Sequence, residues 1–525
     1  VPYLFTNRDL PASHNIMLNL PPGFKVRLFA IGRELQKTRF MAFSPEGVLH
    51  VASMKRYNLE ETGSEIIAFP DRNQDGMADE AIVAASGLAM AHSLAFYEDA
   101  MYVAEARRII RLKDLDGDGI YEQRQVLVDD IPAEGWHTTR TIVIDERNEK
   151  ILVGVGMPCD LCRSENPLSG GSLDPLVPTP EWGSILQFNL DGSGRRIYAR
   201  GVRNTVGLTM HPVTNQLWGT NNGHDLEGPH LPPEWIDIIP DGGFMGFPFV
   251  YGYQVPVNFS IGRYRDAGVL PLRQQDSLLI ASQRRPVALV PAHLAPMDIH
   301  FYTGDLFPAQ YHNAAFVALR GGQTGGNLAR VPGFKVISLH SEPDGSGARL
   351  ADFMTGFGTD PQGSSVWGKP VGIASDRFGH LYVTSDYRMD AVFRIEPGPL
   401  LGTLEHNLPD TLSNASVLPL SATVRLSRFS DTGKSPALTA DLSPYGGSAR
   451  EPFTEVEAGL YRLDRSLEIE GDVGARPLVV KAEQSIDGET EVLEFRRQFV
   501  ILPAFDIEIL TGSLTPGWKV EATSG

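Results

Sequence analysis

The sequence predicts an all-β fold, and three observations lead to that class. Its apolar segments are short, its 525 residues include 53 glycines and 38 prolines, and one pattern of paired apolar runs recurs along the chain. Short apolar runs separated by turn-forming residues are typical of many short strands, because a helix needs a longer periodic segment. With 42% hydrophobic and 21% charged residues, the chain has enough apolar material for a large folded core.

The recurring unit consists of an apolar run, a turn and a second apolar run, and most copies continue into a third run. Its six copies begin at Arg39, His92, Thr139, Thr205, Asp298 and Pro370. Stacked four-stranded blades repeat every roughly 40 to 50 residues in this way. The repeat therefore predicts a six-bladed β-propeller over residues 15–400, with long insertions at 249–297 and 321–367 where function-bearing loops are expected.

The composition changes after this region, and we expect a separate domain there. Residues 401–415, LGTLEHNLPDTLSNA, have the composition of a linker. From residue 416 the chain gives alternating segments such as SATVRLSRF and EVLEFRRQFVIL, which predict a small β-sandwich of immunoglobulin or fibronectin type over 416–525. This domain is a candidate contact for an envelope or protein partner.

Charge and cysteine content restrict the function classes. The formal net charge of −18 argues against nucleic acid as a partner, because a polyanion would be repelled, and no apolar run is long enough to predict a transmembrane segment. Cys159 and Cys162 are the only cysteines, and a single CxxC cannot complete a four-ligand zinc site. A local disulfide and two free thiols both remain open; the disulfide favours an exported protein, periplasmic or extracellular in its mature form.

Two acidic, glycine-centred loops, DRNQDGMAD and DLDGDGIYE, lie between strand-like runs. Their oxygen-bearing side chains alternate along the chain, which converges hard ligands on one point as calcium requires. The candidate metal ligands are Asp71, Asn73, Asp75 and Asp79 in the first loop and Asp114, Asp116, Asp118 and Glu122 in the second. Ile82 and Gln125 stand where an EF-hand has its bidentate glutamate, so each loop is either a different, structural calcium site or a metal-free turn.

Polar residues lie next to several of the predicted inner strands. The candidates are His137 and Arg140 in GWHTTR, Arg203 and Asn204 in GVRNTVGL, Arg320 in FVALRGG and Lys369 in WGKPVGIASD. If these loops open on one face, one imidazole and four cations gather around the central channel. Such a site suits a ligand with several carboxylates and a base that takes a proton from an alcohol. The alternative for His137 is a packing role, which is the more common fate of a single histidine.

The order of these motifs resembles the glucose/sorbosone dehydrogenase family, which includes soluble quinoprotein glucose dehydrogenases. The resemblance covers roughly residues 20–397 and rests on the joint order of GWHTTR, GVRNTVGL, DGGFMGFP, HLAPMDIHFYTGDLFP, FVALRGG, GFKV and GKPVGIASDRFGHLYVTSD. It implies a six-bladed propeller that binds pyrroloquinoline quinone and calcium on its top face. The implied activity is oxidation of a sugar or related alcohol or aldehyde by hydride transfer, with an external electron acceptor.

The resemblance also implies roles for individual residues. His137 matches the general base, which would remove the hydroxyl proton of the substrate, and Arg203 with Asn204 matches the pair that touches the quinone oxygens. Arg203 and calcium would then stabilise the negative charge that develops on those oxygens. An arginine suits this role because it cannot lose its proton.

The remaining matches concern calcium and the carboxylates of the cofactor. Gly246 and Pro248 lie in a stretch that resembles the one whose backbone carbonyls hold calcium. Arg320 and Lys369 are the nearest matches for the cations that pair with the cofactor carboxylates, and Arg140 is a further candidate for cofactor binding. The chain departs from the glucose-oxidising members at Arg320, where they have lysine, and at GKP, where they have an arginine-rich stretch.

Two other classes of function stay open. A calcium-dependent propeller lactonase would need carboxylate ligands on the inner strands, for which Asp160, Asp225 and Asp298 are the candidates. A non-catalytic extracellular or envelope protein would use the propeller and the sandwich for binding or assembly. Binding of the quinone separates the dehydrogenase from the non-catalytic protein.

Overall fold

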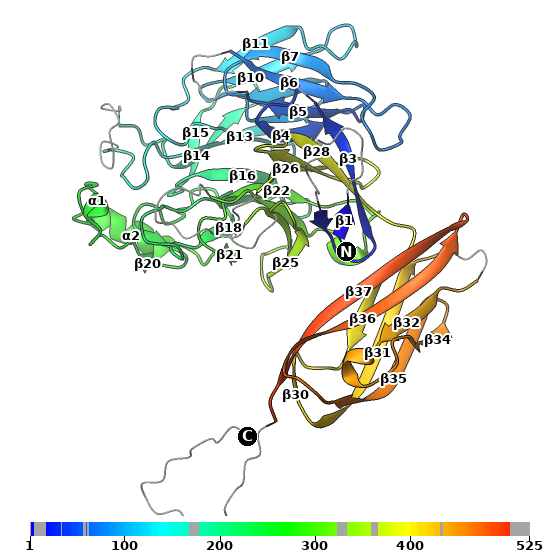
Figure 1. The fold of residues 1–525 in the computed structure, drawn as a ribbon. Helices are drawn as coiled ribbons and strands as arrows, with labels where there is room; N and C mark the ends of the chain where they lie inside the picture. Colours follow the sequence, from blue (N-terminus) through cyan, green and yellow to red (C-terminus); the bar gives the residue numbers. More distant parts are fainter. Residues whose placement is uncertain are drawn as a thin grey trace, which may run out of the picture. The chain divides into compact units, whose positions relative to one another are not determined.

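The computed structural model describes residues 2–4, 17–32, 34–55, 59, 62–166, 178–322, 333–358, 366–430 and 434–504. Nearly all the regular elements of the described residues are strands, so the all-β class expected from the sequence is confirmed. The chain divides into two compact units, one made of Pro2–Leu20 with Lys25–Glu396 and the other of Pro21–Phe24 with Pro397–Gly525. In Figure 1 the first unit runs from blue to green and yellow, and the second from yellow to red.

The first unit contains six four-stranded antiparallel sheets. The first sheet is β4 (Thr38–Phe43), β5 (Leu49–Ser53), β6 (Ser64–Phe69) and β7 (Ile82–Leu88). The second is β8 (Ser93–Tyr97), β9 (Ala100–Ala104), β10 (Ile109–Lys113) and β11 (Gln123–Val128). The third is β12 (Ile142–Asp145), β13 (Lys150–Val155), β14 (Ser184–Asn189) and β15 (Arg196–Arg200).

The later sheets carry the insertions. The fourth sheet is β16 (Thr205–Met210), β17 (Leu217–Asn221), β18 (Glu234–Ile238) and β21 (Ala288–Val290). The fifth is β22 (Pro296–Phe301), β23 (Ala315–Leu319), β24 (Lys335–His340) and β25 (Arg349–Met354). Before β21 the chain forms the β19–β20 pair (Val250–Tyr251, Val255–Pro256) and the helices α1 (Gly262–Arg265) and α2 (Gln274–Ser282), and the 3-10 turn η1 (Ala309–Tyr311) follows β22.

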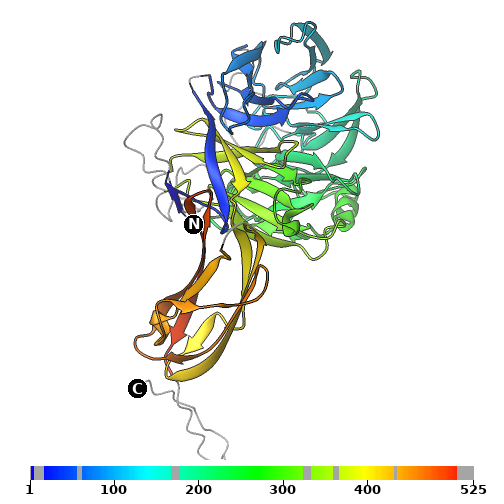
Figure 2. The same ribbon diagram turned by 90° about the vertical axis from the view of Figure 1, so that its right-hand side faces the viewer.

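The sixth sheet joins the two ends of the unit. Its strands β26 (Lys369–Ser375), β27 (Leu381–Asp386) and β28 (Ala391–Pro397) are completed by β3 (Phe24–Ile31), which comes from the start of the chain. Figure 2 shows the blue β3 beside the yellow end of the unit. A further pair, β1 (Pro2–Leu4) and β2 (Met17–Asn19), adjoins the fifth sheet, because Asn19 and Thr355, which follows β25, exchange two backbone hydrogen bonds.

Hydrogen bonds join each sheet to the next near the beginnings of the first strands, and the series returns to the first sheet. The bonds are Phe40 N to His92 O, Ser93 Oγ to Arg140 O, Thr141 Oγ1 to Val206 O, Thr220 Oγ1 to Met297 O, Ile373 N to Asp298 Oδ2 and Thr384 Oγ1 to Arg39 O. Three of them connect residues at the beginnings of successive first strands, and two of the others start from Thr220 in β17 and Thr384 in β27, second strands that pair antiparallel with β16 and β26. The strands β4, β8, β12, β16, β22 and β26 therefore begin at the same end of the unit.

Glycines let the backbones of these first strands approach one another. A Cβ added to Gly207 in β16 would lie 2.2 Å from the carbonyl oxygen of Met297 in β22, and one added to Gly372 in β26 would lie 2.9 Å from the Cα of Phe40 in β4. Real Cβ contacts are not that short, so only glycine fits at either position. The glycines of the GVRNTVGL and GKPVGIASD motifs thus serve close packing between sheets.

The core lies between the faces of neighbouring sheets. The second strands β5, β9, β17, β23 and β27 are buried along their whole length, whereas the outer strand β11 has its first four residues exposed. One apolar cluster joins the second and third sheets through residues such as Tyr102 and Ile151, and another joins the sixth and first through Tyr382 and Val51. Packing on both faces explains why the sequence shows continuous apolar runs at the inner strands.

The second unit consists of two sheets around one apolar core, which includes Leu420, Tyr461, Val480 and Phe495. One sheet has the order β29 (Leu401–His406), β31 (Ser416–Arg428), β35 (Leu460–Ile469), β34 (Thr454–Glu457). The other has the order β30 (Thr411–Ser413), β37 (Glu489–Leu502), β36 (Gly474–Ile486), β32 (Ala437–Asp441), β33 (Glu451–Pro452), and the 3-10 turn η2 (Ser443–Tyr445) lies between β32 and β33.

The expected linker at 401–415 is wrong. The segment contains β29, which pairs with β31, and β30, which pairs with β37. Leu408 and Leu412 are buried in the core of the second unit. The asparagines and proline of this segment suggested an open linker, but its leucines fill the core and its backbone completes both sheets.

No helix among the described residues is both long enough and apolar enough to cross a membrane.

Candidate functional site

The structure places His137, Arg140, Arg203, Asn204 and Lys369 at or shortly before the beginnings of first strands. His137 and Arg140 precede β12, Arg203 and Asn204 precede β16, and Lys369 opens β26. Because those strands begin at one end of the unit, these residues lie at the same end. They form two groups there, one around Arg203 and the other around Asp386.

The first group, here called the imidazole–carboxylate cluster, consists of His137, Asp160, Arg203, Asp225 and His293. Arg203 is buried and donates from Nη2 to Asp160 Oδ1 at 2.7 Å and to Asp225 Oδ2 at 2.9 Å, and from Nε to the Asp160 carbonyl at 2.9 Å. His293 Nδ1 lies 3.7 Å from Asp225 Oδ1. Two carboxylates therefore already balance the charge of the arginine that the sequence assigned to the quinone oxygens.

His137 is held in one tautomer within this cluster. Its Nδ1 lies within hydrogen-bond distance of the Met157 carbonyl, which can only accept, so Nδ1 carries the proton and Nε2 keeps a lone pair. Burial lowers the pKa of His137 to about 3, and the positive charge of Arg203 contributes. A Cβ on Gly156 would lie 2.5 Å from His137 Cβ and 2.9 Å from Asn204 Oδ1, so glycine at 156 allows these two side chains to come together.

A cavity of about 190 Å³ opens beside the cluster, lined by Trp136, Asp160, Leu161, Asp225, Leu226, Arg263 and Tyr264. Tyr264 comes from α1, in the insertion at 249–297, and its hydroxyl donates to Asp160 Oδ2 at 2.7 Å. Burial and the charge of Asp160 raise the pKa of Tyr264 far above its ordinary value. The insertion thus supplies one wall of the cavity, as long loops on a rigid scaffold often do.

Cys159 and Cys162 form a disulfide, so the disulfide that the sequence left open against two free thiols is present. Both cysteines are buried, and Asp160 and Leu161 lie between them. The bond closes a short loop that presents the carboxylate of Asp160 to Arg203. This CxxC is therefore a positioning element of the imidazole–carboxylate cluster.

The second group, here called the cation cluster, consists of Arg39, Arg320, Lys369 and Asp386. Arg39 Nη1 donates to Asp386 Oδ2 at 2.9 Å, and Arg320 Nε donates to Asp386 Oδ1 at 3.0 Å. Lys369 Nζ lies 4.8 Å from the ring centroid of Tyr387. Burial lowers the pKa of Lys369 to about 8, and the charge of Arg320 contributes. Three cations surround one carboxylate, so the cluster has an excess of positive charge.

Arg140 has a different environment from the other cations. It is almost completely buried, and its terminal nitrogens donate to the backbone carbonyls of Pro132, His137 and Thr139. Burial lowers its pKa to about 9. These bonds fix the backbone around His137, so Arg140 positions the imidazole, and the cofactor contact assigned to it from the sequence has no support in this arrangement.

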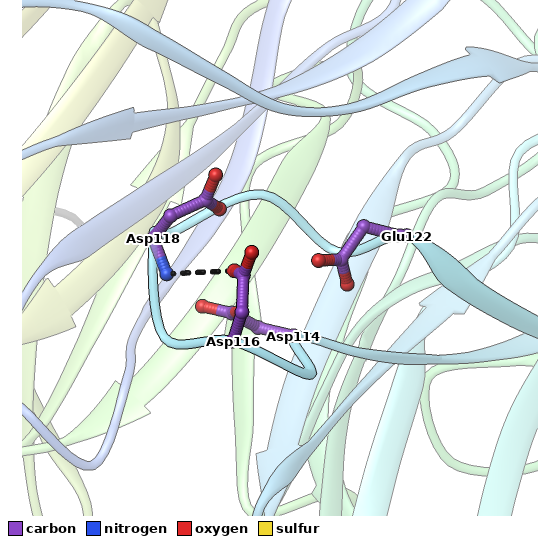
Figure 3. A group of neighbouring side chains, drawn as sticks. All are labelled: Asp114, Asp116, Asp118 and Glu122. Atoms are coloured by element: carbon purple, nitrogen blue, oxygen red, sulfur yellow. Dashed lines mark hydrogen bonds between the residues drawn. The ribbon is translucent and has the colours of Figure 1, made fainter.

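The second acidic loop brings its four predicted ligands together. Oxygen atoms of Asp114, Asp116, Asp118 and Glu122 all lie within 4.8 Å of one another, and Figure 3 shows the four carboxylates around the loop that joins β10 to β11. Although burial raises the pKa of Asp114, hydrogen bonds from the backbone of Gly119 and Gly117 lower it overall. The carboxylate is thus favoured in the ionised form that a divalent cation requires.

The first acidic loop joins β6 to β7, the equivalent position in the first sheet, which explains why the motif recurs. Its hydrogen bonds match those of the second loop, where Asp114 accepts from the N–H groups of Gly117 and Gly119 and Glu122 accepts from the N–H of Leu115, but among the described residues only the second loop gathers its carboxylates within 4.8 Å. Asp71 accepts from the N–H groups of Asp75 and Gly76, and Asp79 accepts from the N–H of Arg72. Asp71, Asn73, Asp75 and Asp79 therefore act as turn-forming residues in this conformation.

Of the predicted calcium residues Gly246 and Pro248, Gly246 has a carbonyl oxygen that is already used in this conformation. The carbonyl oxygen of Gly246 accepts from the N–H groups of Phe249 and Val250, both at 3.0 Å. A carbonyl oxygen has two lone pairs, and both are occupied here. The residues present therefore do not fit a calcium ion held by Gly246.

The sequence analysis gave no role to several residues of these clusters. His293, Tyr264, Arg39 and Asp386 went unassigned, and so did Glu234, which is buried with Oε2 unpartnered. Burial raises the pKa of Glu234 to about 8. A signal exists for His293, which has φ of 64° and is followed by Ala295 at 48°, because non-glycine residues with positive φ often mark functional sites. These φ angles are visible only in the tertiary structure.

Two family models match parts of this chain. A family model described as TrAA12-like matches residues 271–397, and a domain of unknown function, DUF7133, matches residues 11–141. An uncharacterised protein of Borreliella burgdorferi is 26% identical over 382 residues, which cover 70% of this chain and 88% of that protein.

Two solved structures share the fold. One is the calcium structure of carbohydrate-active enzyme family AA12 from Trichoderma reesei, with a TM-score of 0.56, 18% identity and coverage of 75% of this chain and 100% of that chain. The other is the holo form of the PQQ domain of pyranose dehydrogenase from Coprinopsis cinerea, with a TM-score of 0.54, 18% identity and coverage of 73% and 98%. The resemblance to quinone-dependent sugar dehydrogenases that the motifs predicted is confirmed, and at this identity the likeness establishes the fold.

Proposed function

We propose that this chain is a quinoprotein oxidoreductase that takes a sugar or a related alcohol or aldehyde as its substrate and pyrroloquinoline quinone as its cofactor. The observation that carries the proposal is the position of His137 and the cation cluster at the same end of the first strands. The fold shared with the holo PQQ domain of pyranose dehydrogenase supports it.

The six sheets would then be the blades of a closed six-bladed propeller, and the second unit a β-sandwich of immunoglobulin or fibronectin type. The hydrogen bonds that return from the sixth sheet to the first support closure, as does the entry of β3 into the sixth sheet. A closed ring suits the role because it fixes side chains from six distant segments around one axis.

The residues present fit the carboxylates of the quinone. Arg39 and Arg320 donate to the carboxylate of Asp386, and burial together with the charge of Arg320 lowers the pKa of Lys369 to about 8. A bound polycarboxylate would supply negative charge beside these cations. When bound, the quinone would accept the hydride from the substrate carbon.

His137 is the proposed base. Its proton on Nδ1 is held by the Met157 carbonyl, so the lone pair on Nε2 is the one that would take the hydroxyl proton of the substrate. Its low pKa keeps the ring neutral in the neutral range, so the lone pair on Nε2 stays free. Arg203 and Asn204 would orient the reacting groups, with Asp160 and Asp225 fixing the guanidinium.

Within this proposal the protein is exported, because the Cys159–Cys162 disulfide persists in an oxidising compartment such as the periplasm or the extracellular space. Electrons would leave to an external acceptor. The second unit would be available to an envelope or protein partner. Calcium would be structural, held by the second acidic loop on the β10–β11 hairpin.

A non-catalytic binding protein is the second candidate. The pairing of Arg203 with both Asp160 and Asp225 favours it, because an arginine with two carboxylate partners has less need of a ligand. The lactonase is not proposed, since Asp298 accepts from the backbone N–H groups of Ile299 and Ile373 instead of joining the other two carboxylates.

Reconstitution tests the proposal. Purified full-length protein is titrated with pyrroloquinoline quinone, with and without calcium, while quinone absorbance reports binding and a redox dye reports turnover on a panel of aldoses. We expect saturable binding and turnover. His137→Ala should keep quinone binding and lose at least 99% of turnover, and Lys369→Met should weaken binding at least tenfold. Failure of the wild type to bind the quinone would leave the non-catalytic candidate.

The controls use residues of the same type outside both clusters. His312→Ala changes a half-exposed histidine that follows η1, and Lys113→Met changes a lysine at the end of β10 that is paired with Asp99. Both variants should bind the quinone and turn over like the wild type. Loss of turnover in His312→Ala would withdraw the assignment of His137 as the base.

A further inference from the structure

A second cavity lies at the opposite end of the first strands from both clusters. It has a volume of about 440 Å³, within the range of small-molecule sites, and lies between the first and sixth sheets. Its lining includes the turn at 376–380, which follows β26, whereas Lys369 opens that strand. Six residue steps of about 3.3 Å separate the two ends, which places this cavity roughly 20 Å from the cation cluster.

The walls of this cavity are aromatic. Phe29 from β3, Phe43 from β4 and Tyr382 from β27 line it, and the Tyr382 ring lies 5.0 Å from the centroid of each phenylalanine ring. Phe378 lies in the turn after β26 and is 50% exposed, with the Arg377 guanidinium 4.9 Å from its ring centroid. An aromatic ring left half exposed beside a cavity is available to stack on a flat ligand.

The polar side of the cavity is built around Arg394. Its Nη2 donates to His380 Nε2 at 2.8 Å, and His380 Nδ1 in turn donates to Asp376 Oδ2 at 2.8 Å. Arg394 also pairs with Glu396 at 3.1 Å. The guanidinium is 8% exposed, and its Nε has no hydrogen-bond partner among the described residues. A buried, unpartnered N–H of a charged group favours binding of an acceptor oxygen.

The first acidic loop packs against Arg394. Gly76 has φ of 86°, and a Cβ added there would lie 1.8 Å from Arg394 Nη1, so only glycine allows the loop to close. The loop residues Asp71, Arg72 and Gln74 line the cavity. The DRNQDGMAD motif thus forms a wall of this cavity, whereas the equivalent loop of the second sheet gathers carboxylates.

Two of the carboxylates that line this cavity are already engaged. Both oxygens of Asp71 and both oxygens of Asp376 accept hydrogen bonds from the protein. Glu46 also lines the cavity, as do Arg377 and Arg394. A ligand would complement this cavity if it placed an acceptor oxygen near Arg377 and Arg394 and an apolar body between the aromatic walls.

We propose that this cavity binds a small aromatic carboxylate, with the ring against Phe378 and Phe43 and the carboxylate at Arg394 and Arg377. Two coplanar oxygens match the fork of a guanidinium, and the aromatic walls match a flat apolar body. The site is separate from the proposed quinone site and does not depend on it.

Benzoate is the probe, with benzyl alcohol and acetate as partial analogues, and calorimetric titration of the full-length protein gives the dissociation constants. Benzoate should bind saturably with one site per chain, at least tenfold more tightly than either analogue. Arg377→Gln and Phe378→Ala, both in an exposed turn, should each weaken benzoate binding at least fivefold. Arg394→Gln should weaken it most.

Matched controls come from the equivalent turns of other sheets. Arg147→Gln, in the turn after β12, and Val213→Ala, in the turn after β16, should leave benzoate binding unchanged, as should Lys369→Met. The proposal is overturned if benzyl alcohol binds as tightly as benzoate, or if Arg377→Gln and Phe378→Ala both bind benzoate like the wild type. Loss of benzoate binding in Lys369→Met would overturn it too, by placing the ligand in the cation cluster.

Discussion

Arg203 donates a hydrogen bond to Asp160 across 2.7 Å, although the two residues are 43 positions apart in the chain. Both side chains are buried, and the loop that carries Asp160 is closed by the Cys159–Cys162 disulfide. The charge state of the proposed active site therefore depends on a pair that neither GVRNTVGL nor MPCDLCR reveals alone. Four predictions follow from this pair and from other contacts of the first unit.

Removing Asp160 should destabilise the first unit strongly. Asp160→Ala leaves the buried guanidinium of Arg203 without its main partner, and breaking a buried ion pair costs about 3–5 kcal/mol. Asp225→Ala is the matched control, because Asp225 is 47% exposed and its loss should cost only about 1 kcal/mol. Urea denaturation followed by tryptophan fluorescence measures both losses, and equal losses would contradict the central role of Asp160.

Reduction of the disulfide should lower stability by a smaller amount. A bond that closes the short loop from Cys159 to Cys162 is worth about 2 kcal/mol in the loop-entropy model. Denaturation with and without dithiothreitol should therefore show a lower midpoint in reductant. The double variant Cys159→Ser and Cys162→Ser should have that lower midpoint in both conditions, and a midpoint that still responds to reductant in this variant would be inconsistent with the assignment.

Asp298 should make stability fall as the pH rises. Burial raises its pKa from 3.8 to about 7, so between those values the folded chain holds a proton that the unfolded chain has lost. The protonated carboxyl group therefore contributes its full free energy of unfolding below about pH 4. This contribution is lost progressively up to about pH 7 and amounts to as much as about 4 kcal/mol, at about 1.36 kcal/mol per pKa unit. The buried histidines act in the opposite direction below pH 6.5, so the comparison must be made against a variant.

Asp298→Asn provides that comparison. The amide does not ionise, so the difference in unfolding free energy between wild type and variant should change steadily from pH 4 to 7 and then level off. Denaturant titrations at several pH values measure it. A difference that stays constant over this range would rule out the raised pKa.

The second acidic loop should bind a trivalent lanthanide. Tyr121 lies within the loop, so excitation of tyrosine should sensitise terbium held by Asp114, Asp116, Asp118 and Glu122. Asp116→Asn with Asp118→Asn should reduce the saturable emission at least tenfold. Asp75→Asn, in the first loop, should leave it unchanged because Asp75 is not part of this group of carboxylates. Equal emission from all variants would exclude the loop as a metal site.

The strands of the first unit could be predicted from the sequence to a large extent. The six paired apolar runs correspond to the first two strands of the six sheets, because inner strands buried on both faces must be continuous apolar segments. The linker at 401–415 could not be predicted. Its turn-forming residues are visible locally, whereas the burial of Leu408 and Leu412 depends on a core that includes residues of β35, β36 and β37, which are distant in the chain.

The residues of the candidate site could also be predicted only in part. GWHTTR and GVRNTVGL pointed to His137 and Arg203, since polar residues next to an inner strand stand out against apolar surroundings. The partners of those residues did not stand out. Asp225 and His293 lie in loops of ordinary composition, and Tyr264 comes from an insertion whose position the repeat does not define.

The sequence by itself determined the strand pattern, the number of repeats and the type of side chain at the beginning of each inner strand, because these follow from residues that are neighbours in the chain. Only the tertiary structure decided which charges compensate each other, and that the first acidic loop closes over Arg394. Such pairings depend on distances of a few ångströms between distant segments, and the electrostatic and packing energies that fix them vary steeply over that range.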